Sequence, residues 1–157
     1  MTLSRDPAVW LATVFGVGKL PWAPGTWGSL VALPLAWLIT DWGGSWALLG
    51  AIVLVFYFGV WAADRTAKKA GTADPGSVVI DEVAGQWLAL LLIAPNWIGY
   101  AVGFALFRLF DIVKPWPVSW ADRKIKGGLG IMLDDLLAGS YVLILALIYG
   151  YVASYFQ

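Results

Sequence analysis

The sequence contains no cysteine and no histidine, and charged residues make up only 13% of its 157 positions. Without cysteine the chain can form neither disulfides nor thiolate sites. Without histidine it lacks the commonest general base and the usual zinc ligand. Any catalysis must therefore use carboxylates, lysine, arginine or hydroxyl groups, and carboxylates suit a hard cation such as Mg²⁺. Ten acidic and ten basic residues balance, so no basic field favours nucleic acid.

What the sequence has in abundance is apolar side chains. Hydrophobic residues make up 61% of the chain and the mean hydropathy is +0.78, whereas soluble domains are about half apolar and a quarter charged. The eleven tryptophans are a residue type that favours the membrane–water interface. Composition therefore predicts an integral membrane protein, and the length suits a single domain over residues 1–157.

Four uncharged runs carry this hydrophobicity. They cover residues 20–40, 42–63, 83–107 and 136–157. About 20 helical residues cross a bilayer core, a length that the second and fourth runs reach. The first run is marginal, because its prolines delay the helix to about Thr26 and Pro34 predicts a kink.

The third run allows two interpretations. It is either one long span or two short helices, 82–94 and 97–110, that turn at Pro95 and Asn96. The hairpin would leave all ten basic residues on the cytoplasmic side, whereas the single span would split them five and five, so the positive-inside rule favours the hairpin. We therefore expect an all-α, polytopic membrane bundle with three full spans and a short helical hairpin. Three polar segments, 16–29, 64–82 and 108–135, would then meet at the cytoplasmic interface.

Acidic pairs stand next to apolar runs at two places. Asp81 and Glu82 precede the third run, and Asp134 and Asp135 precede the fourth. Taken alone, Asp134 and Asp135 are explained equally well as a helix cap that complements the helix dipole. The same explanation is open for Asp81 and Glu82, but a metal role is favoured there because the pair opens a highly apolar helix. Together with Asp111 the two pairs exceed what capping requires, and carboxylates at a membrane are costly unless they are paired or bind a cation. We therefore predict a metal site formed by Asp81, Glu82, Asp111, Asp134 and Asp135.

Basic and hydroxyl side chains accompany these acids. Arg108 and Asp111 are spaced i,i+3 and share a helix face, and Lys114 follows three residues later. Such a row could bind phosphate, or it could be a salt-bridged helix end. The glycine-rich segment 16–29 contains Lys19, Thr26 and Ser29. It indicates either a phosphate site at a helix N-terminus or a capped, proline-stiffened helix entry.

Four segments in order resemble those of the phosphatidylglycerophosphatase A family of bacterial membrane enzymes. They read GVGKLPWAPGTWGSL, GSVVIDEVAGQW, FRLFDIVKPWPVSWADRKIKGG and GIMLDDLLAG. The resemblance implies Mg²⁺-dependent hydrolysis of the terminal phosphate of phosphatidylglycerophosphate to phosphatidylglycerol, in phospholipid biosynthesis. It also implies a location in the bacterial inner membrane, with the active site facing the cytoplasm and an anionic phospholipid as substrate.

The resemblance extends to individual residues. The implied catalytic groups are Asp81, Glu82, Arg108, Asp111 and Lys114, and the metal ligands are the five acids named above. The resemblance also implies that Arg123 faces the phosphate, and the glycine-rich segment adds Lys19, Thr26 and Ser29 as predicted substrate-binding groups.

Three alternatives remain at this point. A lipid phosphotransferase ranks low, because the sequence lacks the aspartate-rich signature of that class. A transporter would place ionisable residues near the bilayer midplane, and a non-catalytic membrane subunit would use the acids only as caps. The attacking group, water or an aspartate, and the oligomeric state are left open.

Overall fold

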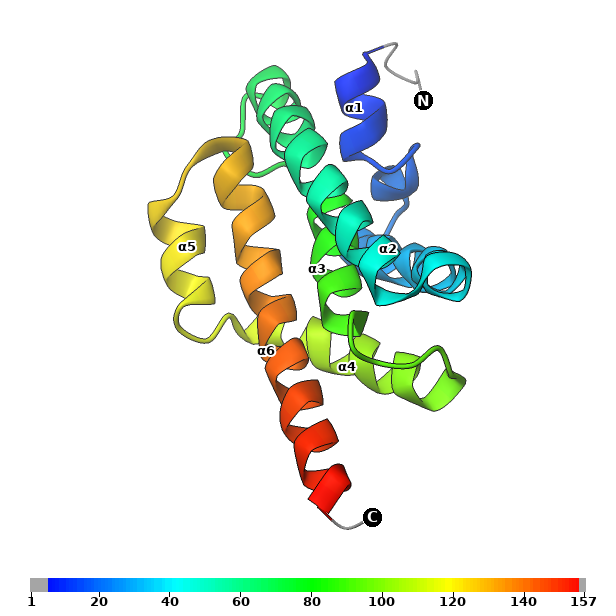
Figure 1. Ribbon diagram of the computed structural model, residues 1–157. Coiled ribbons are helices and arrows are strands. Elements are labelled where there is room, and N and C mark those ends of the chain that lie inside the picture. The colour runs from blue at the N-terminus through cyan, green and yellow to red at the C-terminus, as the bar shows by residue number, and fades with distance from the viewer. Residues whose placement is uncertain (1–5, 156–157) are drawn as a thin grey trace.

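The computed structural model describes residues 6–155, and these residues form an all-helical bundle without strands (Figure 1). The elements in chain order are α1 (Pro7–Ala12), the short 3-10 helix η1 (Val17–Lys19), α2 (Pro24–Ala70), α3 (Ile80–Leu90), α4 (Trp97–Val113), α5 (Val118–Lys124) and α6 (Gly127–Tyr155). The central helix is α3, which packs against both α2 and α6.

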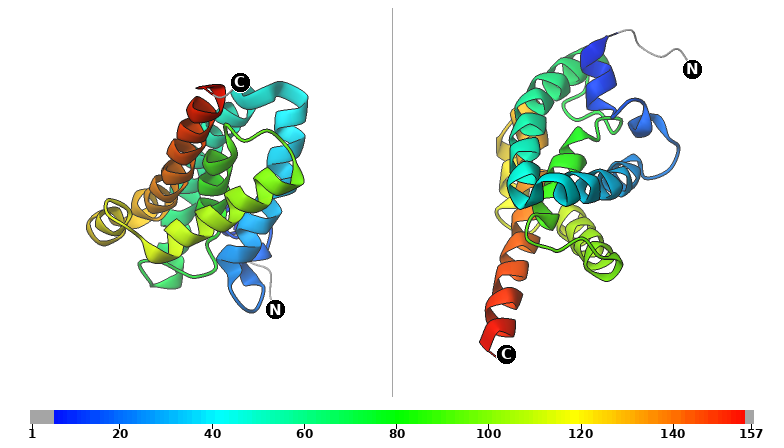
Figure 2. Two further views of the ribbon diagram at one scale, coloured as in Figure 1. Left: turned by 90° about the horizontal axis from the view of Figure 1, so that it is seen from below. Right: turned by 45° about the vertical axis from the view of Figure 1, so that its right-hand side comes forward.

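The long helix α2 contains the first two apolar runs. It begins at Pro24, two residues before the expected start at about Thr26. Proline is well suited to the first helical position, because it has no N–H group and an N–H group there would have no partner within the helix. The chain breaks helical geometry inside α2 at Gly44, where φ is 67° and ψ is −170°. A left-handed φ favours glycine, and the two parts of α2 run in different directions on either side of it (Figure 2).

The third apolar run forms two helices, α3 and α4, as the hairpin interpretation predicted. A single span over residues 83–107 is therefore excluded. The side chain of Asn96 caps α4, since its Oδ1 accepts a hydrogen bond of 2.7 Å from the backbone N–H of Gly99. The hairpin turn is thus stabilised by local side-chain chemistry.

The last helix, α6, begins at Gly127, well before the predicted run at residue 136. Gly128 and Gly130 belong to this helix. A Cβ on Gly128 would collide with the backbone carbonyl of Val60, and one on Gly130 with that of Ile125. These glycines therefore permit close packing, and Asp134 and Asp135 lie two turns inside α6, where capping cannot explain them.

Two helices, α2 and α6, are long and apolar enough to cross a membrane. Large apolar side chains remain exposed on both of them: Trp42 is 95% exposed and Tyr149 is 77% exposed. Lipid is the environment in which such surfaces are stable. The start of α1, the C-terminal end of α2 and the N-terminal end of α6 gather at one end of the molecule, opposite the C-terminus (Figure 1).

Candidate metal and phosphate site

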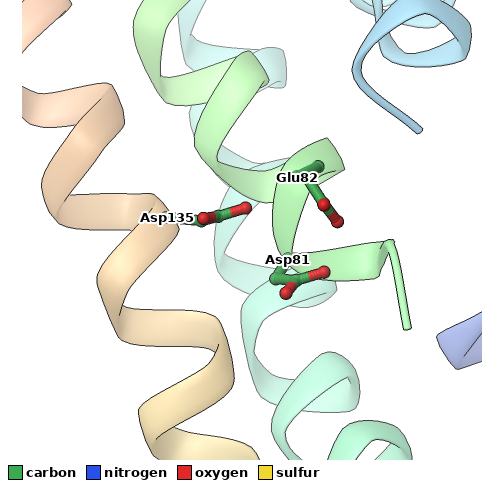
Figure 3. A group of neighbouring side chains, drawn as sticks. All are labelled: Asp81, Glu82 and Asp135. Carbon is green, nitrogen blue, oxygen red and sulfur yellow. The ribbon is translucent and has the colours of Figure 1, made fainter. Parts of the chain in front are cut away.

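Three carboxyl groups meet between α3 and α6. Asp81 and Glu82 come from the first turn of α3, and Asp135 comes from α6. Each offers one oxygen, and these oxygens all lie within 4.8 Å of one another (Figure 3). We refer to Asp81, Glu82 and Asp135 as the carboxylate cluster.

Close contact between α3 and α6 brings this cluster together. A Cβ on Gly85 would stand 2.6 Å from the backbone carbonyl oxygen of Asp135, and a Cβ on Gly139 would collide with that of Gly85. Glycine at both positions lets the two backbones approach. Asp81 is four residues before Gly85 on the same face of α3, so this approach directs its carboxyl toward Asp135.

The cluster is deeply buried and incompletely hydrogen-bonded. Asp81 is 9% exposed and Asp135 is 4% exposed. Oδ1 of Asp81, Oε2 of Glu82 and Oδ2 of Asp135 have no hydrogen-bond partner. Several buried carboxylates in contact repel one another unless a cation or protons compensate them. This set of hard oxygen donors therefore fits a divalent metal ion such as Mg²⁺.

Arg108 lies beside the cluster on α4. Its Nη1 is 2.7 Å from Oδ2 of Asp111 and 3.9 Å from Oε1 of Glu82. The same nitrogen is 3.5 Å from Oγ of Ser29, whose own hydroxyl donates to the carbonyl of Gly25. Asp111 thus anchors the guanidinium at the edge of the cluster, where it could contact an anion.

The start of α2 is shaped to fit this arrangement. A Cβ on Gly25 would collide with Oε1 of Glu82 and lie 3.3 Å from Nη1 of Arg108. Only glycine leaves both side chains where they are. The glycine-rich segment therefore contributes through close backbone approach, in addition to its hydroxyl groups.

Lys114 forms a second charged group at the end of α4. Its Nζ lies 2.6 Å from Oδ1 of Asp122 and 2.7 Å from Oδ2 of Asp134. Burial opposes the charge of Lys114, but these hydrogen bonds raise the pKa of its ammonium group above the usual value. Asp134 also accepts a hydrogen bond of 3.1 Å from the backbone N–H of Asp135. Lys114 therefore ties α4 to α5 and α6 and fixes the residue next to the cluster.

A small pocket of about 50 Å³ opens beside Lys114's partners. Its polar lining residues are Asp74, Asp122, Lys126 and Asp134. Burial raises the pKa of Asp74. The charge of Lys114 lowers this pKa, whereas the neighbouring acids Asp122 and Asp111 raise it further. This region is a partly buried polar rim, separate from the carboxylate cluster.

The structure brings together some of the predicted site residues and leaves others apart. Asp81, Glu82 and Asp135 form the cluster. Asp111 lies beside Asp135 and Glu82 and also pairs with Arg108, whereas Asp134 pairs with Lys114. Within residues 6–155, no hydrogen bond or ion pair joins Lys19, Thr26 or Arg123 to the cluster.

Two further polar residues of this region were not among the predicted site residues. Asp122 binds Lys114, and Gln86 is a fully buried polar residue one turn beyond Glu82. The available signal for Gln86 was its i,i+4 spacing from Glu82 in an otherwise apolar helix.

Comparison with known proteins gives a consistent result. A family model described as phosphatidylglycerophosphatase A matches residues 10–149. The chain is 44% identical over 131 residues to phosphatidylglycerophosphatase A of Escherichia coli K12, covering 82% of this chain and 75% of that protein. It is 39% identical over 140 residues to phosphatidylglycerophosphatase A of Haemophilus influenzae, covering 88% and 86%.

A third relative has a different name. The chain is 42% identical over 144 residues to a provisionally named phosphatidylinositol-3-phosphatase of Bacteroides thetaiotaomicron, covering 87% of this chain and 89% of that protein. No solved structure matches the chain.

Proposed function

Since this chain belongs to the phosphatidylglycerophosphatase A family, we propose that it hydrolyses the terminal phosphate of phosphatidylglycerophosphate at the carboxylate cluster. The products are phosphatidylglycerol and inorganic phosphate. The observation that carries this proposal is the buried meeting of Asp81, Glu82 and Asp135 beside a guanidinium group. A phosphate monoester needs both cationic charge and a proton acceptor around its phosphorus, and this site can supply them.

Mg²⁺ is the cofactor that fits the donor set. Asp81, Glu82 and Asp135 would hold it through their carboxyl oxygens, and each of the three side chains has one oxygen without a hydrogen-bond partner. When bound, the metal supplies Lewis-acid stabilisation of charge on the phosphoryl oxygens. Asp111 and Asp134, also predicted as ligands, act in our proposal as anchors for Arg108 and Lys114.

Side chains of the protein bind the phosphate, accept a proton and position the helices. Arg108, which Asp111 and Ser29 hold in place, binds a phosphoryl oxygen. A carboxylate of the cluster accepts the proton of the attacking water as its oxygen bonds to phosphorus. The bond from phosphorus to the glycerol oxygen breaks, the departing alkoxide takes up a proton from solvent water, and the carboxylate releases its proton to solvent. Lys114 keeps Asp134 and α6 in register with the site.

Lys19, Thr26 and Arg123 remain proposed contacts for the lipid headgroup. Thr26 directly follows Gly25, which touches Glu82 and Arg108 in this arrangement. Lys19 and Arg123 lie on the flanking elements η1 and α5. Basic side chains at the rim of such a site would attract an anionic lipid.

We further propose a multi-pass protein of the bacterial inner membrane, with the two parts of α2 and helix α6 as spans and α3–α4 as a short hairpin. Basic residues support an orientation with the site toward the cytoplasm: Arg65, Lys68 and Lys69 end α2, and Lys124 and Lys126 precede α6. These ends lie together in Figure 1, as the positive-inside rule requires of cytoplasmic segments. The substrate's acyl chains would stay in the bilayer while its headgroup enters the site.

A substrate comparison tests this function. Purified protein in mixed micelles with Mg²⁺ is offered phosphatidylglycerophosphate or phosphatidylinositol 3-phosphate, the substrate class in the name of the third relative, and released phosphate is measured. We expect a higher kcat/KM for phosphatidylglycerophosphate. Faster release from the inositol lipid would overturn the substrate assignment, and no release from either would overturn the phosphatase assignment.

A further inference from the structure

Gln86 is a polar residue with no visible partner in the interior of the bundle. It is 0% exposed, and neither Oε1 nor Nε2 of its side chain makes a hydrogen bond. An unsatisfied buried amide is costly, and an apolar residue would fill the same space at less cost. A residue of this kind indicates a role in a state of the site in which the amide is paired.

Helix geometry locates Gln86 at the junction of α3 with α4. Glu82, Gln86 and Leu90 are spaced four residues apart and therefore follow one face of α3. At one end of this face Glu82 lies against Arg108. At the other end the side chain of Leu90 packs on α4, 2.7 Å from where a Cβ on Gly103 would stand. Gln86 therefore lies on the same face of α3, between the two residues that make these contacts and about 6 Å along the helix from Glu82.

The groups beside Gln86 have complementary unmet hydrogen-bonding capacity. Nε of Arg108 is a buried donor with no acceptor, and Oε2 of Glu82 is a buried acceptor with no donor. Oε1 of Gln86 can accept from the first, and its Nε2 can donate to the second. A single amide between the two side chains would satisfy four unpaired atoms at once.

We propose that Gln86 is a positioning residue that bridges Arg108 and Glu82 when phosphate occupies the site. Its Oε1 accepts from Nε of Arg108, which turns the remaining guanidinium N–H groups toward the phosphoryl oxygens. Its Nε2 donates to Glu82, which fixes that carboxylate within the cluster. This inference rests on the proposed function, because it assumes that the anion bound by Arg108 is the phosphate to be released.

Kinetics of matched variants test the bridge. Gln86→Met retains the length of the side chain but makes no such hydrogen bonds, and Gln86→Leu is a second apolar replacement. Thr66→Val is the control, because Thr66 is also buried, at 5% exposed, and its Oγ1 also has no partner, but it lies elsewhere on α2. We expect kcat/KM to fall about tenfold to a hundredfold for both Gln86 variants. This is the factor that corresponds to the loss of a hydrogen bond to a charged group. Thr66→Val should keep the wild-type value.

A double-variant cycle and a binding measurement separate positioning from mere structural support. In the Arg108→Gln background, Gln86→Met should lower kcat/KM little further, because each change removes the same hydrogen bond between Gln86 and Arg108. Inorganic phosphate with Mg²⁺ should raise Tm of the wild type, and Gln86→Met should lose most of that shift while keeping the shift caused by Mg²⁺ alone. Multiplicative losses in the double variant would overturn the proposal.

The two proposals can fail separately. If wild-type protein releases phosphate from phosphatidylglycerophosphate and both Gln86 variants match Thr66→Val, the bridge is wrong and the function stands. If wild-type protein releases none, but phosphate still raises Tm through Gln86, the bridge stands and the function is wrong. Loss of stability in both Gln86 variants with unchanged kcat/KM per folded molecule would also overturn the bridge.

Discussion

The carboxyl group of Asp135, two turns inside α6, lies within 4.8 Å of that of Asp81 in the first turn of α3. Neither side chain is explained as a helix cap: the cap residue of α3 is Val79, and α6 has already begun at Gly127. Both carboxyl groups are buried. Because like charges in a buried site repel, this contact is the strongest structural argument that the helices are arranged around a cation.

Removing one of these two carboxylates should separate stability from metal binding. We expect Asp81→Asn and Asp135→Asn to keep or raise Tm in EDTA, since each removes an uncompensated buried charge. Mg²⁺ should raise Tm of the wild type by mass action and leave both variants nearly unchanged. Asp64→Asn is the control, because Asp64 pairs with Lys68 on the surface. An Mg²⁺ response in both cluster variants equal to that of the wild type would contradict the metal assignment.

Gly25→Ala should disturb the site from α2, by crowding side chains of α3 and α4. The added Cβ would collide with Oε1 of Glu82 and crowd Arg108, so one or both side chains must move. Misplacement of catalytic groups by a fraction of an ångström to an ångström typically costs about tenfold to a hundredfold in kcat/KM, and we expect a loss of that size. Gly50→Ala, in the same helix but next to open space, should leave kcat/KM unchanged. Equal activity in the two variants would show that the contact does not matter.

Lys114→Met should loosen the junction of α4, α5 and α6. The variant leaves Asp122 and Asp134 without the ammonium group that they share, and we expect a loss of about 1–3 kcal/mol in the free energy of unfolding. Lys68→Met breaks an exposed i,i+4 pair with Asp64 and should cost less than about 1 kcal/mol. Denaturation of both purified variants in detergent compares them directly. If Lys114→Met lowers the free energy of unfolding no more than Lys68→Met does, Lys114 does not cross-link the three helices.

Asp74 should make stability depend on pH. Burial raises the pKa of its carboxyl group above the ordinary value for an aspartate. The folded state therefore binds the proton more tightly than the unfolded state, and the cost of ionising Asp74 appears as pH rises through the raised pKa. Asp74→Asn removes this cost, so the variant should have a higher Tm than the wild type at pH 7, and the gap should shrink toward pH 4. A gap that widens on acidification would reverse the sign and contradict the argument.

Local pattern predicted much of this molecule. The apolar runs located the helices, and the positive-inside rule correctly favoured two helices over one span between residues 82 and 110. The i,i+3 spacing of Arg108 and Asp111 predicted a shared helix face, and the two side chains form an ion pair of 2.7 Å there. Each of these features depends on residues close together in sequence, where helix periodicity alone determines the neighbours.

Features that depend on distant residues could not be predicted. The first turns of α6 precede the apolar run, and they pack through Gly128 on the backbone carbonyl of Val60, a residue far away in the sequence. The start of α6 was therefore misplaced, and with it the setting of Asp134 and Asp135. The pairing of Lys114 with Asp122 likewise arises from how α4 meets α5, and the burial of Gln86 arises from the packing of other helices around α3.

Phosphate release from phosphatidylglycerophosphate by wild type and Asp135→Asn, measured across an Mg²⁺ titration with EDTA as the zero point, tests the central claim most directly. The account predicts release by the wild type that requires Mg²⁺, and almost none by folded Asp135→Asn at any Mg²⁺ concentration. Wild-type rates in Asp135→Asn, or release by the wild type that persists in EDTA, would contradict a metal-dependent active site at the carboxylate cluster.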